Sequence, residues 1–398
     1  MKPILKREPE LPAQQTIWTK GFISIFFTSL ALNMGIYMCD AMLSLYADSL
    51  GASVSAIGML MSFFAVSSIA FRFVSAPVMD TYNRKYVVVF ASLVLSAAFF
   101  GYSISNNVAL LLGFRLLQGC GMAFGNACCL AIVADMLPKE KYSSGIGYYS
   151  LSQVISQASG PTIGLFLIGR VGYPITFVAI ACILLAAAIL ATRIKIGFSR
   201  TKKLKLSLNN IVAKEALLPA MLMFLVGAGV SSLMSFLILF ARTKGVVSNI
   251  GLFFTVNAVT MLVTRPLIGK LTDRFGFVKV IVPSLLCCFA TFYIVSFSAS
   301  LWGFLLAAFI SAFGIGACQP ALQSPTMKSV TNERRGVASS TNFIGLDLGA
   351  LAGPAIAGAA VQVLGYIPMW HIMSIFSMSA LTITVLFRKK ITAIEKDF

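Results

Sequence analysis

The sequence predicts an all-α membrane protein with twelve transmembrane helices in two pseudo-symmetric six-helix bundles. Three observations lead to this class. The composition is too apolar for a soluble domain, twelve apolar runs are long enough to cross a bilayer, and one offset of 193 positions aligns the two halves of the chain.

The composition excludes an ordinary soluble protein. Of the 398 residues, 58% are hydrophobic and 11% are charged, whereas a soluble domain has about 25% charged residues. Each apolar run reaches the roughly 20 residues that a spanning helix needs. The runs are 20–46, 53–76, 84–104, 108–135, 142–168, 173–194, 214–241, 248–269, 277–297, 300–327, 335–363 and 366–387.

The positive charge follows the predicted topology. One alternating set of connecting segments and tails holds 25 Lys and Arg residues and the other set holds 3. Because cytoplasmic loops are enriched in basic residues, this split places both termini in the cytoplasm of a multi-pass protein of the cell membrane. The net charge of +18 is then explained by topology, and binding to nucleic acid is not needed to account for it. Three arginines, Arg72, Arg115 and Arg265, fall within spans.

Other classes of site find little support. The first apolar run is too long for a cleavable signal peptide, and no small-residue cleavage site follows it. All eight cysteines lie inside spans, without the spacing of a metal site or of a disulfide framework. The single histidine, His371, has no companion with which to form a site. We therefore expect no cofactor and no metal.

A repeat divides the chain into two halves. Gly160-Pro161 recurs as Gly353-Pro354 at an offset of 193 positions. The same offset aligns Arg72 with Arg265, Asp80 with Asp273, Gly121 with Gly314, Glu140 with Glu333, and Gly172-Tyr173 with Gly365-Tyr366. We predict an N-terminal bundle over 1–194, a basic cytoplasmic linker over 195–213 and a C-terminal bundle over 214–398. Six spans return the chain to the same side, so the repeats are parallel and related by an axis along the membrane normal.

Three motifs make the chain resemble the major facilitator superfamily, in particular its proton-coupled efflux branch with twelve spans. The loop after the second span matches the G-x-L-a-D-r-x-G-r-K signature at Asp80, Arg84 and Lys85 and departs from it at Ala76 and Asn83. The second copy keeps both glycines, Gly269 and Gly276, around Asp273 but lacks the basic pair. The other two motifs are R-x-x-Q-G from Arg115 to Gly119 and G-P-x-x-G from Gly160 to Gly164, with Ser156 where an upstream glycine is usual.

The resemblance implies a gate on the cytoplasmic side. It implies that Asp80 contacts Arg84 and the N-terminus of the eleventh helix, holding that side shut, and Asp135 can join this cluster. The glycine-proline elements predict a bend and a close helix contact where the two halves meet, although loop anchoring and ordinary packing would also explain these residues. The expected gating residues are Asp80, Arg84, Lys85, Asp135, Gly160, Pro161, Gly164, Asp273, Gly353 and Pro354.

Ionisable residues inside spans predict a site for substrate and proton, because each costs at least about 2.5–3.5 kcal/mol at a helix centre. Asp40 and Arg115 lie at similar depths in the first and fourth spans, so they can pair or share a cavity. Asp347 lies near the middle of the eleventh span. A carboxylate in a low-dielectric cavity can take up a proton near neutral pH and so change which side is favoured. The expected binding residues are Asp40, Arg115, Asp347, Asn33, Tyr37, Gln118 and Gln319.

Other interpretations fit the same residues. The Asp–Arg pair can be a structural pin between helices, and Gln153, Gln157, Gln319 and Gln323 can line a cavity or join helices. The leading interpretation is a transporter, not an enzyme, that exports small amphipathic molecules as a monomer by proton antiport. The chain has no nucleotide-binding loop for ATP. A sugar or siderophore-type carrier is the second hypothesis, and a non-transporting membrane sensor is less favoured.

Overall fold

The computed structural model describes residues 16–52, 54–194, 212–246, 249–389 and 391–392. Within these ranges the chain is helical and contains no strand. The long helices are α1 (Lys20–Ser49), α2 (Val54–Thr81), α3 (Arg84–Ile104), α4 (Val108–Met136), α5 (Tyr142–Thr192), α7 (Leu217–Thr243), α8 (Leu252–Phe275), α9 (Phe277–Phe297), α10 (Leu301–Lys328), α11 (Arg335–Leu364) and α12 (Tyr366–Leu386). Three short 3₁₀ turns precede α5, α7 and α11, namely η1 (Lys139–Lys141), η2 (Lys214–Ala216) and η3 (Asn332–Arg334).

Eleven of the described helices are long and apolar enough to cross a membrane, and α5 supplies two of the twelve predicted spans. Its 51 residues are broken at Gly172, where φ is 78° and ψ is 173°. The repeat-related glycine, Gly365, adopts φ 86° and ψ 178° between α11 and α12. The same backbone reversal therefore turns the chain at the same place in both halves.

The ends of several helices follow from local sequence. Asn83 caps α3 by accepting a hydrogen bond from the backbone N–H of Lys85, and Asn107 caps α4 by accepting from that of Leu110. Gly276, with φ 85°, separates α8 from α9. Prolines inside helices, such as Pro77, are tolerated because neighbouring helices shield and re-satisfy the freed backbone groups.

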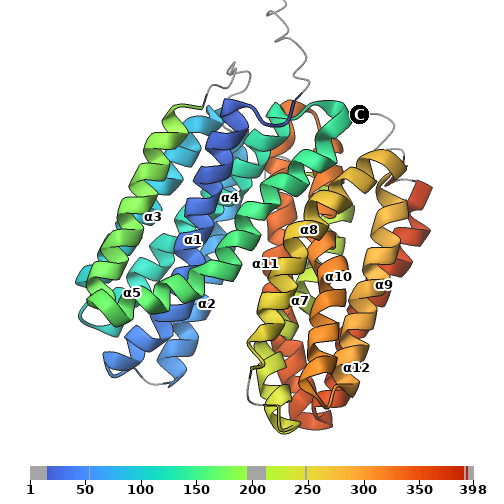
Figure 1. Cartoon of the computed structure of the whole chain (residues 1–398). Coiled ribbons are helices and arrows are strands. Elements are labelled where there is room, and N and C mark those ends of the chain that lie inside the picture. The colour runs from blue at the N-terminus through green and yellow to red at the C-terminus, as the bar shows by residue number, and fades with distance from the viewer. Residues whose placement is uncertain (1–15, 53, 195–211, 247–248, 390, 393–398) are drawn as a thin grey trace, which may run out of the picture.

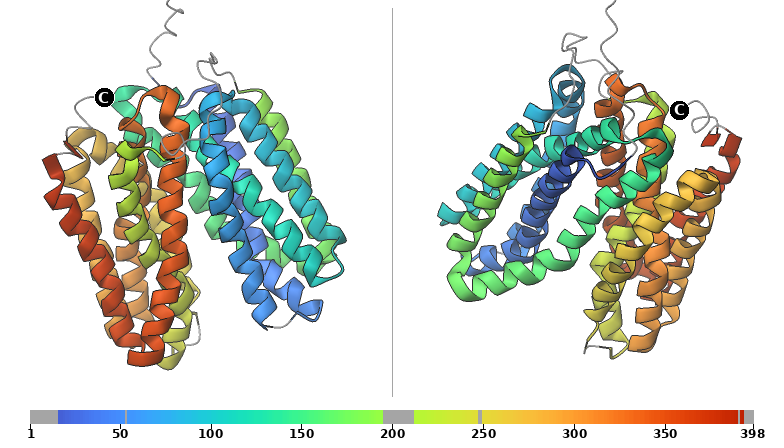
Figure 2. Two further views of the ribbon diagram at one scale, coloured as in Figure 1. Left: turned by 180° about the vertical axis from the view of Figure 1, so that it is seen from behind. Right: turned by 45° about the horizontal axis from the view of Figure 1, so that its top comes forward.

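Figures 1 and 2 show two bundles, α1–α5 and α7–α12, which we call the N half and the C half. The halves touch at the end where α1 begins and α12 ends, and they diverge toward the other end. We call the first of these the basic end, because its connecting segments carry most of the lysines and arginines. Each half has its own buried apolar core, and a small cluster of Val154, Ala258, Met261 and Ala312 joins them.

Candidate functional site

Asp80 links the two halves at the basic end. It lies in the last turn of α2, and its carboxylate accepts hydrogen bonds from the backbone N–H groups of Gly336 at 2.8 Å and Val337 at 3.3 Å. These N–H groups belong to the first turn of α11, which has no intrahelical acceptor for them. Arg84, four residues further along the chain at the start of α3, lies 3.2 Å from the same carboxylate. Asp80 thus makes the two contacts that the family resemblance implied.

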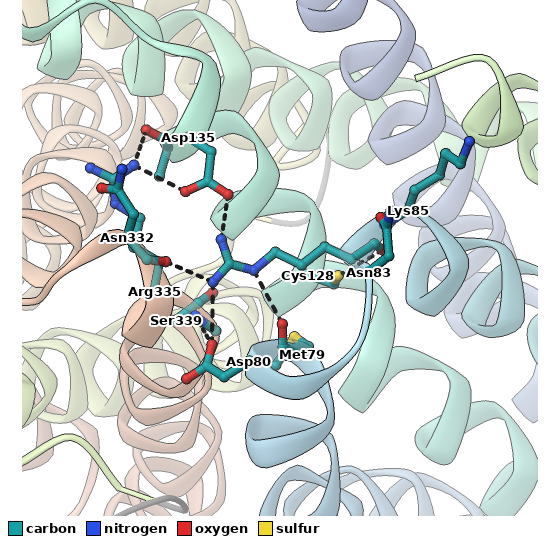
Figure 3. Close-up of polar contacts among 12 residues, drawn as sticks. Met79, Asp80, Asn83, Lys85, Cys128, Asp135, Asn332, Arg335 and Ser339 are labelled. Atoms are coloured by element: carbon teal, nitrogen blue, oxygen red, sulfur yellow. Dashed lines mark hydrogen bonds and ion pairs between the residues drawn. The ribbon is translucent and has the colours of Figure 1, made fainter. Parts of the chain in front are cut away.

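Arg84 gathers the surrounding charges into one cluster. Its guanidinium forms ion pairs with both Asp80 and Asp135 and donates to the backbone oxygen of Asn332 at 2.9 Å. Figure 3 shows how these groups converge between α2, α4 and the start of α11. Arg335 of α11 pairs with Asp135 at 3.0 Å, so the cluster ties both halves together. The guanidinium of Arg84 is largely buried, so water screens these contacts only weakly.

Lys85 does not join this cluster, although the sequence analysis grouped it with the gating residues. Its ammonium lies over the ring of Tyr86, 5.1 Å from the centroid, and its side chain points away from Asp80 and Asp135 (Figure 3). Neighbouring positions on a helix point in different directions. Because Arg84 faces the cluster from the first turn of α3, Lys85 cannot face it too.

Asp273 repeats the Asp80 contact from the other half. It lies near the end of α8 and accepts hydrogen bonds from the backbone N–H groups of Ser143 at 2.9 Å and Ser144 at 2.8 Å, in the first turn of α5. The hydroxyl of Ser144 donates to it as well, at 2.5 Å. The second copy of the signature therefore makes this contact without its basic pair.

A second charged contact between the halves lies deeper in the helices. Nε of Arg72 in α2 donates to the carboxylate of Asp347 in α11 at 2.7 Å, and the hydroxyl of Ser68 lies 3.4 Å from the same oxygen. The guanidinium also lies 5.0 Å from the centre of the Phe343 ring. Asp347 was expected at a binding site, but the sequence analysis did not identify Arg72 as its partner.

Asp40 and Arg115 pair within the N half at 2.9 Å. Arg115 is 3% exposed and Asp40 is 42% exposed at the side chain, so the pair has one buried and one open member. Gln118 accepts a hydrogen bond from Arg115 at 2.7 Å and another from the Tyr102 hydroxyl at 2.8 Å. These contacts fix the guanidinium while leaving the carboxylate accessible.

Asn33 and Tyr37 share a face of α1, but their bonds do not lead to Asp40. Asn33 donates to the Ser29 backbone oxygen one turn earlier at 2.8 Å. The Tyr37 hydroxyl accepts from Gln153 of α5 at 3.3 Å. Asp40 instead pairs with Arg115 of α4, so no hydrogen bond joins these three residues.

A chain of polar side chains crosses from α5 to α10. Gln319 donates to Gln153 at 3.0 Å. The same Gln319 accepts from Nη2 of Arg265 in α8 at 3.2 Å. Gln319 was an expected binding residue, whereas Arg265 was only noted as lying within a span. The repeat, which aligns Arg265 with Arg72, was the one feature of the sequence that could have identified Arg265 as a site residue.

The glycine-proline elements require a correction. We expected their close contacts where the two halves meet, but both lie inside a half. A Cβ added at Gly160 would lie 2.8 Å from that of Tyr37, and one at Gly164 would lie 3.1 Å from the sulfur of Met42, both in α1. One at Gly353 would lie 2.7 Å from Cα of Ala228 in α7. These bare faces let α5 pack on α1 and α11 pack on α7.

The proline of each element stands within a continuous helix. Pro161 lies inside α5 and Pro354 inside α11. The only residue of α5 with non-helical dihedral angles is Gly172. The break in this helix therefore comes at the glycine between the fifth and sixth spans.

Comparisons with known proteins agree with this architecture. The family model described as Major Facilitator Superfamily matches residues 25–246 and 219–396. The multi-drug resistance efflux pump PmrA of Streptococcus pneumoniae is 24% identical over 374 residues, covering 90% of this chain and 93% of the pump. The quinolone resistance protein NorA of Staphylococcus aureus is 23% identical over 353 residues, covering 86% and 90%.

Solved structures show the same fold. The human organic anion transporter MFSD10 superimposes with a TM-score of 0.77 at 17% identity, covering 94% of this chain and 100% of that one. The transporter FucP in its outward conformation superimposes with a TM-score of 0.75 at 14% identity, covering 92% and 98%. The family model spans nearly all of the helices described above. The chain is therefore a multi-pass membrane transporter of the major facilitator superfamily.

Proposed function

We propose that this transporter exports small amphipathic molecules across the cell membrane in exchange for protons, acting as a monomer with its basic end in the cytoplasm. The observation that carries alternating access is the pair of reciprocal contacts made by Asp80 and Asp273. Each carboxylate binds the N-terminus of a helix in the opposite half. Breaking both contacts would release the basic end and let the bundles rock about their shared centre.

Two carboxylates supply the means of proton coupling. Asp347 is tied to Arg72 across the halves, so a proton on Asp347 would remove an ionic tie that opposes opening of the basic end. Asp40 lies toward the opposite, diverging end and is partly exposed, which suits a group that receives protons from outside. Protonation of either carboxylate would also leave an arginine without its counterion. Efflux against inward proton flow follows if substrate and proton favour different arrangements of the halves.

The names of the efflux pumps PmrA and NorA support the direction of transport. The sequence also contains 32 Phe and 17 Met residues. Aromatic and methionine side chains suit varied apolar substrates because they adapt their shape. Lipid contact and core packing account for many of these residues as well.

The test is transport by purified protein in proteoliposomes with and without an imposed pH gradient. The probes are ethidium, a fluoroquinolone and a sugar, and proton movement is followed with an internal pH dye. Wild type should accumulate ethidium or the fluoroquinolone only with the gradient. Asp40→Asn and Asp347→Asn should lose this gradient dependence, whereas Glu140→Gln, at an exposed carboxylate in η1, should keep it.

The outcomes separate the alternatives. Full gradient-driven accumulation by both asparagine variants would refute the assignment of the coupling residues. Gradient-independent movement of the sugar alone would favour a metabolite carrier instead. A protein that moves none of the probes would contradict the proposed substrate class.

A further inference from the structure

The intramembrane charges among the described residues do not balance. Asp40 pairs with Arg115, and Asp347 pairs with Arg72. Arg265, in the middle of α8, makes no ion pair among the residues that the structure describes. The buried interior thus holds one cation in excess.

Arg265 is held only by neutral groups. Its side chain donates to the backbone oxygen of Gly316 at 3.2 Å and that of Ser150 at 2.8 Å, and to the amide oxygen of Gln319 at 3.2 Å. The residue is 2% exposed. A buried charge without a counterion is costly. A guanidinium has about five N–H donors, so these three bonds leave donor capacity for another acceptor.

The repeat shows what is missing beside Arg265. Its equivalent in the N half, Arg72, pairs with Asp347, and the position equivalent to Asp347 is Val154. Val154 lies one helical turn after Ser150, on the face of α5 that already contacts Arg265. Its side chain is buried against α8 and α10. The repeat-related pair therefore keeps the arginine, in the C half, and has an apolar side chain in the N half where the carboxylate would stand.

Arg265 lies beside the Gln153–Gln319 bond, which joins the two halves. Among the described residues, the Gln153–Gln319 bond is the hydrogen bond between α5 and α10 that lies farthest from the basic end. Gln153, Gln319 and the adjoining Tyr37 are partly exposed, whereas Arg265 beside them is buried. Because Arg265 donates to Gln319, the guanidinium directly adjoins these partly exposed amides.

We infer that Arg265 is a binding residue for a carboxylate carried by the substrate, with Gln319, Gln153 and Tyr37 as its neutral hydrogen-bond partners. A guanidinium matches a carboxylate with two parallel hydrogen bonds. The substrate would thus supply the charge that Val154 does not. This inference rests on the proposed transport function and adds organic anions with an apolar body as a substrate class, to which the fluoroquinolone probe belongs and ethidium does not.

The test compares two matched probes, dansylglycine and dansylglycinamide, which differ in the carboxylate. Binding to full-length protein in nanodiscs is measured by dansyl fluorescence, with empty nanodiscs as the lipid blank. Wild type should bind the acid at least tenfold more tightly than the amide. Arg265→Gln should abolish that preference, and Arg265→Lys should keep part of it. The control Arg170→Gln removes an exposed cation far from this cluster and should change nothing.

A second variant covers the case in which Arg265→Gln does not fold. Val154→Asp restores the carboxylate that the repeat lacks, so it should pair with Arg265 and reduce binding of the acid to the level of the amide. Equal wild-type affinities for the two probes, or binding of neither, would overturn the inference. So would an unchanged preference in folded Val154→Asp. Competition by chloride as strong as that by the acid would assign the site to inorganic anions and refute the organic substrate.

The binding experiment uses no proton gradient. A negative result for the Arg265 site can therefore be told apart from a negative result for proton antiport. A retained carboxylate preference with no gradient-driven transport would leave the Arg265 site standing and reject proton antiport. Gradient-driven transport with no carboxylate preference would support proton antiport and reject the Arg265 site.

Discussion

Asp80 and Asp273 make the same contact in opposite directions across the two halves. Asp80 of the N half binds the N–H of Gly336 at the start of α11, and Asp273 of the C half binds that of Ser143 at the start of α5. Gly336 and Ser143 are themselves separated by the repeat offset of 193 positions. Each carboxylate lies at the positive end of a helix dipole. The basic end is therefore held by two copies of one tie.

Removing these charges should open the basic end. Asn in place of Asp keeps an acceptor oxygen but loses the attraction between a carboxylate and a helix N-terminus, which is worth about 0.3–2 kcal/mol. Asp80→Asn and Asp273→Asn should each raise the population open at this end by about two- to thirtyfold, and the double variant should raise it further. Distances between spin labels at Glu140 and Lys270, measured by double electron–electron resonance, report the change. An unaltered distance distribution in the double variant would contradict this role.

The fold could be predicted from the sequence because the patterns that specify it are long and occur twice. Apolar runs set the spans, and the offset of 193 positions set the halves. The contacts of Asp80 came from resemblance alone, since no local pattern relates the end of α2 to the start of α11. The contact of Asp273 with the start of α5 follows when the repeat offset is applied to the contact of Asp80 with the start of α11.

The partners of the intramembrane residues could not be read from the sequence. Asp347 and Arg72 are far apart in the chain, and their ion pair depends on how α2 packs against α11. For the same reason the sequence did not show that Gly160 contacts α1 within its own half. Spacing along a helix identifies a face, but the neighbour of that face is a property of the assembled bundle.

Arg84 should be far more sensitive to substitution than Lys85. Arg84→Gln leaves Asp80 and Asp135 without their shared cation, and breaking a buried ion pair costs about 3–5 kcal/mol. We expect its thermal unfolding midpoint to fall by several degrees in nanodiscs, followed by differential scanning fluorimetry. Arg84→Lys should recover little, because an ammonium lacks the fork that reaches both carboxylates and the Asn332 carbonyl.

Lys85→Gln is the matched control for this experiment. It removes a neighbouring positive charge on the same turn of α3 but none of the bonds to the cluster. Its unfolding midpoint should stay close to that of wild type. Equal losses at the two positions would show that net charge, and not the buried network, stabilises this end.

The contact of α11 with α7 should not tolerate a methyl group. A Cβ at Gly353 would meet the backbone of Ala228, which cannot move aside as a flexible side chain can. Gly353→Ala should therefore cost about 1–3 kcal/mol in unfolding free energy, the range for overpacked sites. Gly169→Ala is the control, because nothing lies within 4 Å of its added Cβ. Unfolding by sodium dodecyl sulfate, followed by circular dichroism, would compare them, and equal stability of the two variants would reject the close contact.

The backbone reversals at Gly172 and Gly365 should be independent of each other. Both residues combine a positive φ with ψ near 180°, at 78°, 173° and 86°, 178°, a region that costs a residue with a Cβ about 1–3 kcal/mol. Gly172→Ala and Gly365→Ala should each lower the unfolding free energy by that amount in the same assay. The double variant should show the sum to within about 0.5 kcal/mol, since distant sites without shared partners are additive. The two glycines lie in separate halves with separate cores, so a larger coupling would mean that the two turns interact and would contradict their independence.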